Sequence, residues 1–144
     1  MSDLLNVLDQ LRESIAGKAT GVPEPQVRTA GVPSGTSLLG LIKHLTHVER
    51  FYFQSRPITS MKRTFKPTRT ETADDILAAY REAVRESNEV IAQYTDLSRP
   101  APSPGGRGAT PTMQWTLIHM IEETARHAGQ ADILREQIDG ATGR

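Results

Sequence analysis

The sequence predicts an all-α protein, a four-helix bundle built by a single domain spanning residues 1–144. Three observations lead to this prediction. Four segments repeat apolar residues at helical spacing, no segment alternates apolar and polar residues as a strand would, and links rich in proline and glycine separate the four segments. Four long helices in one small domain are typical of a bundle with long connections. A chain of this length can bury a core without disulfides.

The first helix is expected at about residues 2–16, with Gly17 as its end. Its apolar residues recur on one stripe: Leu4, Leu8, Leu11 and Ile15. The segment 18–35 contains three prolines and is expected to be a loop with at most one short turn. The second helix is expected at about residues 37–55, where the hydroxyl of Ser37 can accept a hydrogen bond from a free backbone amide of the first turn.

The third and fourth helices are expected at about residues 72–94 and 112–139. Gly140 follows the last apolar position of the fourth helix and supplies a stop. The link 56–70 is polar and is expected to be irregular. The link 95–111 is rich in proline, glycine and serine, a composition typical of a flexible loop.

Composition excludes several classes of function. Lys plus Arg number 17 and Asp plus Glu number 17, so no net positive charge recruits nucleic acid. The chain contains no cysteine, which excludes disulfides, thiolate metal sites and cysteine nucleophiles. No apolar run approaches the ~20 residues that cross a bilayer. The charged N-terminus does not resemble a signal peptide, so we expect a cytoplasmic protein with no membrane partner.

The helical phase of the second helix separates its two histidines. One turn from His44 lie apolar residues, so His44 is expected to point into the bundle: these neighbours are Leu41 and Val48. The neighbours of His47 at the same spacing are charged or polar, which places His47 on a solvated row.

The fourth helix divides its histidines in the same way. His127 shares an inward row with Glu123, and the other members of this row are apolar: Met120, Ala131, Leu134 and Ile138. His119 shares a row with Trp115 instead, which makes it peripheral. It also lies ~12 Å along the helix axis from His127, too far to bind the same ion easily.

The predicted interior therefore holds His44, Glu123 and His127 among hydrocarbon. An ionised carboxylate buried alone is costly, so something positive is expected beside it. Glu123 and His127 are four residues apart and share one helix face, and an inward His44 adds a third ligand. Two imidazoles and one carboxylate suit zinc, iron or nickel. A buried Glu–His ion pair without a metal would satisfy the same charges and stays open.

Two segments resemble a known superfamily. They are SLLGLIKHLTHVERFYF, at residues 37–53, and WTLIHMIEETARHAGQADILREQIDGATG, at residues 115–143. Both resemble the DinB-like (DinB/YfiT-like) superfamily of four-helix bundles, and within it the actinobacterial branch of uncharacterised proteins related to the mini-circle protein. The resemblance covers two helices strongly, and the general layout extends it over nearly the whole chain. More distantly, the chain is similar to the mycothiol-dependent maleylpyruvate isomerases.

The resemblance implies an up-down-down-up, left-handed bundle that forms homodimers and binds a metal through three side chains. Carried over residue by residue, the metal ligands are His44, Glu123 and His127. Many members have histidine where this chain has Glu123, whereas the similar maleylpyruvate isomerases also use a His, Glu, His set. The branch usually has histidine at Gln130, so a role of that residue at the metal is undecided. Zinc is the first expectation for the ion, with nickel or iron as alternatives.

The resemblance also implies an activity. A divalent metal would activate the sulfur of a low-molecular-weight thiol such as mycothiol or bacillithiol, which then attacks an electrophilic substrate. A metal-dependent hydrolase is the alternative enzyme, and a non-catalytic metal-binding bundle of a stress response is the alternative outside catalysis. His47 and His119 have no assigned role beyond a place near the mouth of the site.

Overall fold

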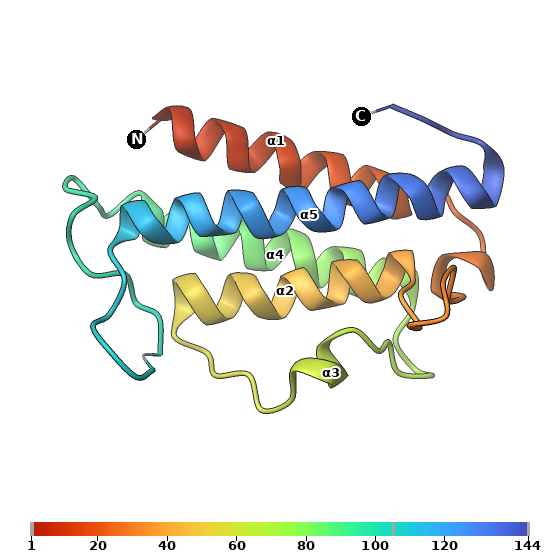
Figure 1. Cartoon of the computed structure of the whole chain (residues 1–144), viewed down its shortest axis with the longest axis horizontal. Coiled ribbons are helices and arrows are strands. Elements are labelled where there is room, and N and C mark those ends of the chain that lie inside the picture. The colour runs from red at the N-terminus through yellow and green to blue at the C-terminus, as the bar shows by residue number, and fades with distance from the viewer. Residues whose placement is uncertain (1, 105, 144) are drawn as a thin grey trace.

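The computed structural model describes residues 2–104 and 106–143, and these residues form helices and links with one isolated β-bridge. This confirms the predicted all-α bundle. Four long helices run side by side, and the links add one short helix and one 3-10 turn (Figure 1). In chain order the elements are α1 (Ser2–Ala19), η1 (Gln26–Arg28), α2 (Leu38–Gln54), α3 (Met61–Thr64), α4 (Ala73–Ile91) and α5 (Met113–Asp139).

The four long helices follow an up-down-down-up order. In Figure 1, α1 and α5 run from left to right, whereas α2 and α4 run from right to left. Because α2 and α4 are parallel, the chain between them must travel back along the bundle, and α3 lies on this return path (Figure 1). α1 packs mainly on α5 and α2 mainly on α4, with α2 also against α5.

Hydroxyl side chains fix where three of the long helices begin. The residue before each helix has an extended backbone, and its hydroxyl oxygen accepts a hydrogen bond from the backbone amide three residues later. These residues are Ser37, Thr72 and Thr112. Asp75 returns a bond to the backbone of Thr72, which completes a capping box. At the other end of the chain, Gly140 takes a left-handed backbone (φ 75°) and ends α5.

Two helix ends differ from those expected. α1 continues past Gly17 to Ala19, because Ala16 and Ala19 extend its buried stripe, and the chain turns only at Gly21 with φ 76°. A single glycine in a helix interior costs only about 1 kcal/mol relative to alanine, which tertiary packing exceeds. α4 ends at Ile91 rather than near Tyr94. Beyond Ile91 the backbone amides of Gln93 and Tyr94 donate to the carbonyl groups three residues earlier, which winds the chain more tightly than an α-helix.

The apolar core forms two clusters along the bundle. Each fully buried Leu or Ile contributes roughly 1.5–3 kcal/mol relative to an exposed position. One cluster includes Ile15, Leu38, Leu39, Leu41, Ile42, Leu45, Tyr80, Ala131 and Leu134. The other includes Leu8, Val48, Phe53, Ile91, Met113, Leu117 and Met120. Buried polar residues separate the clusters along the helices: Arg12 lies between Leu8 and Ile15 on α1, and Thr124 lies between Met120 and Ala128 on α5.

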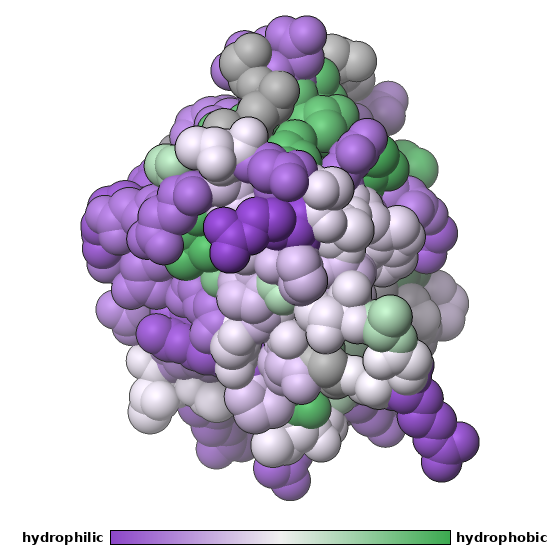
Figure 2. All heavy atoms as spheres, turned by 90° about the vertical axis from the view of Figure 1, so that its left-hand side faces the viewer, coloured by the Kyte–Doolittle hydropathy of each residue, from purple (hydrophilic) through white to green (hydrophobic). Residues whose placement is uncertain are grey.

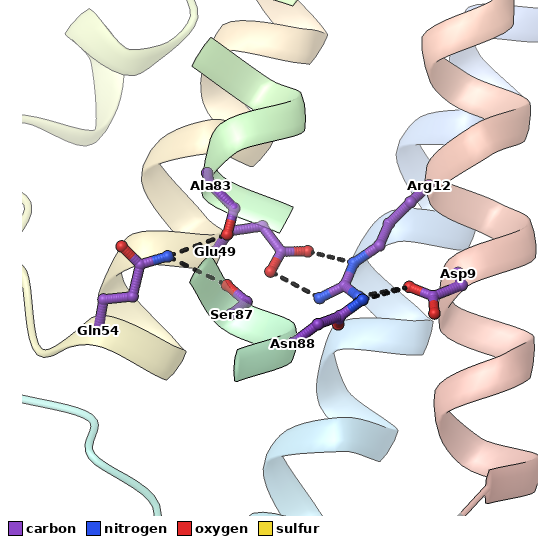
Figure 3. Close-up of polar contacts among 7 residues, drawn as sticks. All are labelled: Asp9, Arg12, Glu49, Gln54, Ala83, Ser87 and Asn88. Carbon is purple, nitrogen blue, oxygen red and sulfur yellow. Dashed lines mark hydrogen bonds and ion pairs between the residues drawn. The ribbon is translucent and has the colours of Figure 1, made fainter. Parts of the chain in front are cut away.

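A buried ion pair joins α1 to α2 at this level (Figure 3). Both nitrogens of the Arg12 fork, Nε and Nη2, donate to the two carboxylate oxygens of Glu49 at 2.7 Å. Nη1 of Arg12 donates to Asp9 (2.7 Å) and to the side-chain oxygen of Asn88 on α4 (2.8 Å). Burial alone lowers the pKa of Arg12, but the charge and hydrogen bonds of Glu49 raise it overall, so the guanidinium stays charged.

One end of the bundle shows a mostly polar surface with apolar patches (Figure 2). Figure 2 looks at the end of the bundle where α1 and α5 begin, and hydrophobic residues gather toward its upper edge. α1 contributes the exposed Val7 and α5 the exposed Trp115 and Ile118 to this half of the molecule. No helix in the described ranges combines the length and the apolar composition that a membrane crossing requires.

Candidate metal centre

The fold brings together the three residues that the sequence singled out. His44 of α2 meets Glu123 and His127 of α5, and one ligand atom from each lies within 4.8 Å of the others. Nε2 of His127 is 3.5 Å and Nε2 of His44 is 4.0 Å from the same carboxylate oxygen, Oε2 of Glu123. Both imidazoles are buried, whereas 23% of the Glu123 side chain is exposed, so the group opens to solvent on the side of the carboxylate.

A hydrogen bond to Thr64 fixes the tautomer of His44. Oγ1 of Thr64 lies 2.8 Å from Nδ1 of His44 and donates its own proton to the carbonyl of Met61 (2.6 Å). Because that hydroxyl proton is already used, Thr64 accepts from His44, and Nδ1 carries the hydrogen. The lone pair of Nε2 is therefore free and faces Glu123.

A hydrogen bond to Gln130 fixes the tautomer of His127. Its side-chain oxygen lies 2.8 Å from Nδ1 of His127, and an amide oxygen can only accept. In the neutral form of the ring the proton is therefore on Nδ1, and the lone pair of Nε2 faces Glu123. Ligating histidines in metalloproteins usually have their second nitrogen hydrogen-bonded in this way.

The link that carries α3 covers one side of the site. The ring of Phe65 stacks on His44, with centroids 3.8 Å apart and planes 10° apart, and it contacts His127 edge-on at 5.9 Å. The link reaches this position at Gly40 of α2, where an added Cβ would lie 2.3 Å from the carbonyl oxygen of Phe65. Only glycine allows this approach without a shift of the backbone. Lys43 ties down the same link by donating to the carbonyl of Lys66 (2.9 Å).

The environment keeps His44 neutral. Burial above all, then the charges of His127 and His47, lowers the pKa of His44 to about 4. A neutral imidazole is the form that binds metals, so His44 needs no proton loss near neutral pH before it can act as a ligand.

These residues fit a divalent cation. Two unprotonated imidazole nitrogens and one carboxylate oxygen converge on one point, which is a common ligand set for zinc and for iron. Three protein ligands leave further coordination positions open, and the exposed side of Glu123 gives access to them.

The other histidines lie outside this group. His47 is half-buried on the next turn of α2, and burial together with the charge of Lys43 lowers its pKa. His119 stacks on Trp115 instead, one turn of α5 before Glu123. Sequence reasoning missed Thr64 and Phe65, because nothing in the polar link 56–70 indicates that it folds back over His44.

A comparison with family models identifies the family of the chain. A family model described as Mycothiol-S-transferase matches residues 3–140, nearly the whole chain. The comparison with curated proteins gives no match. The chain therefore belongs to the Mycothiol-S-transferase family, which is DinB-like, as the resemblance in the sequence implied.

Proposed function

We propose that this member of the Mycothiol-S-transferase family transfers a low-molecular-weight thiol of the mycothiol type to an electrophilic substrate, at a divalent metal held by His44, Glu123 and His127. One observation carries the proposal: two imidazole lone pairs and a carboxylate oxygen, drawn from two helices, converge within 4.8 Å. A bound divalent ion would stabilise the thiolate form of the thiol over the neutral form and so supply the nucleophile.

Each residue of the site has a task in this reaction. Glu123 is the anionic ligand of the set, and its partial exposure leaves an approach for the small thiol. Thr64 and Gln130 hold the two imidazoles in the tautomer and orientation that ligation needs. Phe65 covers His44 and excludes water from that side, which lowers the local dielectric and strengthens the attraction between opposite charges.

The chain brings no thiol of its own, since its sequence contains no cysteine. The sulfur nucleophile must therefore come from the co-substrate. The new bond joins this sulfur to the electrophilic atom, the leaving group departs with its electron pair, and the thiol proton passes to solvent.

The decisive experiment uses the protein loaded with Co(II). Adding mycothiol should produce a sulfur-to-cobalt charge-transfer band in the near-ultraviolet spectrum. His44→Ala should abolish the band, whereas the matched variant His47→Ala, on the same helix but outside the group, should keep it.

The alternatives give different results. No spectral response to mycothiol in a protein that binds cobalt would reject thiol transfer. Hydrolysis of an ester or amide without added thiol would indicate a metal-dependent hydrolase. If the protein unfolds when the metal is removed and the metal-loaded protein binds no thiol, the ion has only a structural role in the bundle.

Three finer expectations belong to the same proposal. Zinc is the first choice for the ion because two histidines and one carboxylate form a common catalytic zinc set. The protein acts as a homodimer, which sedimentation analysis tests. It works in the cytoplasm, where small thiols are kept reduced.

A further inference from the structure

Two residues cover His44, and contacts outside these two residues hold them there. Thr64 is bonded to Nδ1 of His44 and Phe65 stacks on the ring, so we call Thr64 and Phe65 the cover. The cover lies at the end of α3, a helix of four residues, and residues 66–72 that follow it form no helix or strand. A single helical turn is not stable by itself. The position of the cover on His44 therefore depends on contacts with the rest of the molecule.

Lys43 fastens the chain behind the cover to α2, the helix that carries His44. Its Nζ donates to the carbonyl of Lys66 at 2.9 Å and to Oε1 of Glu71 at 2.6 Å. The same oxygen of Glu71 accepts a hydrogen bond from the backbone amide of Thr68 at 2.8 Å. One ammonium group and one carboxylate thus hold this chain at three points directly after the cover.

Arg28 holds the same stretch of chain from η1. Its guanidinium donates to the carbonyl oxygens of Thr68 at 3.2 Å and of Glu71 at 2.7 Å. Two hydrogen bonds of 2.8 Å to the carboxylate of Glu24 fix the guanidinium itself. Arg28, Lys43 and Glu71 belong to three segments that are far apart along the chain, and we call these three residues the clamp.

The clamp is partly shielded from water. The side chains of Lys43, Arg28 and Glu71 are 15%, 28% and 31% exposed. Hydrogen bonds in which one partner is charged are roughly twice as strong as neutral ones. If a member of the clamp is lost, water can replace it at the carbonyl groups that it held. A change in the clamp should therefore release the cover without unfolding the bundle.

We propose that the clamp positions the metal centre: it holds the cover on His44, keeps this ligand in place and slows the escape of a bound ion. The proposal rests on the function proposed above, because it needs the metal site. An ion leaves when its ligands turn away, and the cover prevents His44 from turning. Phe65 lies flat on the imidazole, with planes 10° apart, and Thr64 holds Nδ1. The members of the clamp are positioning residues that do not touch the ion.

The position of the cover can be measured without a metal. A stacked aromatic ring shifts the imidazole hydrogens upfield in the proton NMR spectrum, so the His44 resonances of the metal-free protein report the contact with Phe65. Lys43→Met should move these resonances toward those of Phe65→Ala, and Lys43→Arg, which keeps the charge and the donors, should restore them. Lys62→Met, which removes an exposed lysine of α3, is the control and should change nothing. If the His44 resonances stay in place in Lys43→Met, the proposal is overturned.

A second test measures the release of Co(II) into an excess of chelator. Lys43→Met and Glu71→Ala should each release the ion about tenfold faster. The urea midpoint of the metal-free protein should stay close to that of the unaltered protein, because the clamp is partly exposed. In the double variant Thr64→Val with Phe65→Ala, which removes the cover, Lys43→Met should cause no further acceleration. A further acceleration there would show that Lys43 acts by another route, and would overturn the proposal.

The release rates also separate the clamp from thiol transfer. If cobalt leaves faster in Lys43→Met but mycothiol gives no sulfur-to-cobalt band in the unaltered protein, thiol transfer is rejected and the clamp is supported. If the band is present but Lys43→Met releases cobalt no faster than the unaltered protein does, the clamp alone is overturned. A folded protein that binds no cobalt overturns both proposals.

Discussion

Two clusters of polar residues each take one member from α2, Glu49 in one and His44 in the other, and they are built in opposite ways. In the Arg12–Glu49 pair, the guanidinium forms hydrogen bonds to Glu49, Asp9 and Asn88, and both oxygens of Glu49 are used. In the group of His44, Glu123 and His127, the hydrogen bonds lie on the outer nitrogens, and the inner atoms face one another across 3.5 and 4.0 Å.

The difference separates a closed cluster of hydrogen bonds from a group that could hold a metal ion. The ion pair has opposite charges in balance and needs no further partner. The histidine group turns two ring nitrogens and a carboxylate oxygen toward one another, an arrangement that a cation among them would stabilise. Loss of a member should therefore destabilise the fold in the first case and weaken ion binding in the second.

The largest expected effect is on the ion pair. Arg12→Ala leaves the carboxylate of Glu49, which is fully buried, without its partner. The free energy of unfolding should fall by about 3–5 kcal/mol in urea denaturation, while the metal content of the folded protein stays the same. The double variant Arg12→Met with Glu49→Leu should recover much of this loss. A loss below about 1 kcal/mol, the range of surface pairs, would show that the pair is not buried in solution.

The next effect is on the metal centre. Glu123→Gln keeps the size of the side chain but removes the negative ligand, so metal affinity should fall by roughly tens of fold in competition with a chelator. The unfolding of the metal-free protein should hardly change. Glu122→Gln, next in sequence and exposed, serves as the control and should bind metal normally. Unchanged metal content in Glu123→Gln would refute the ligand assignment.

A smaller effect is expected at the residue that orients His44. Thr64→Val removes the hydroxyl that accepts from Nδ1, so the ring loses its fixed tautomer, and metal affinity should fall about tenfold. Calorimetric titration measures this. Thr64→Ser keeps the hydroxyl and should bind as the unaltered protein does; if the valine and serine variants bind equally, the hydrogen bond has no role in ligation.

The smallest effect is expected on the fold when the metal is removed. The two apolar clusters and the Arg12–Glu49 pair do not involve the metal ligands, so chelation should leave the far-ultraviolet circular dichroism unchanged at 25 °C. The Tm should fall only through the lost binding energy, and more so at higher initial metal concentration. Unfolding on chelation would mean that the histidine group, like the ion pair, holds the bundle together.

The sequence predicts the convergence of His44, Glu123 and His127 better than it predicts what surrounds them. Helical phase separates His44 from His47 and His127 from His119, because long amphipathic helices carry a periodic signal. Thr64 and Phe65 lie in a link whose path depends on its contact with α2 at Gly40. The sequence of the link itself does not indicate this contact, because the two segments are far apart along the chain. Arg12 reads as one of many surface cations, although its position on the stripe between Leu8 and Ile15 indicates an inward side chain.

The position of the ion pair between the two apolar clusters has a consequence for how the bundle tolerates change. Apolar side chains pack acceptably after a helix slides by one turn of ~5.4 Å, but a bidentate arginine pair does not. The two hydrogen bonds between Arg12 and Glu49 thus fix the position of α1 along the axis of α2. Deleting four residues between Arg12 and Gly17 would keep the helical phase of α1, yet would bring the chain that follows out of alignment with the rest of the bundle.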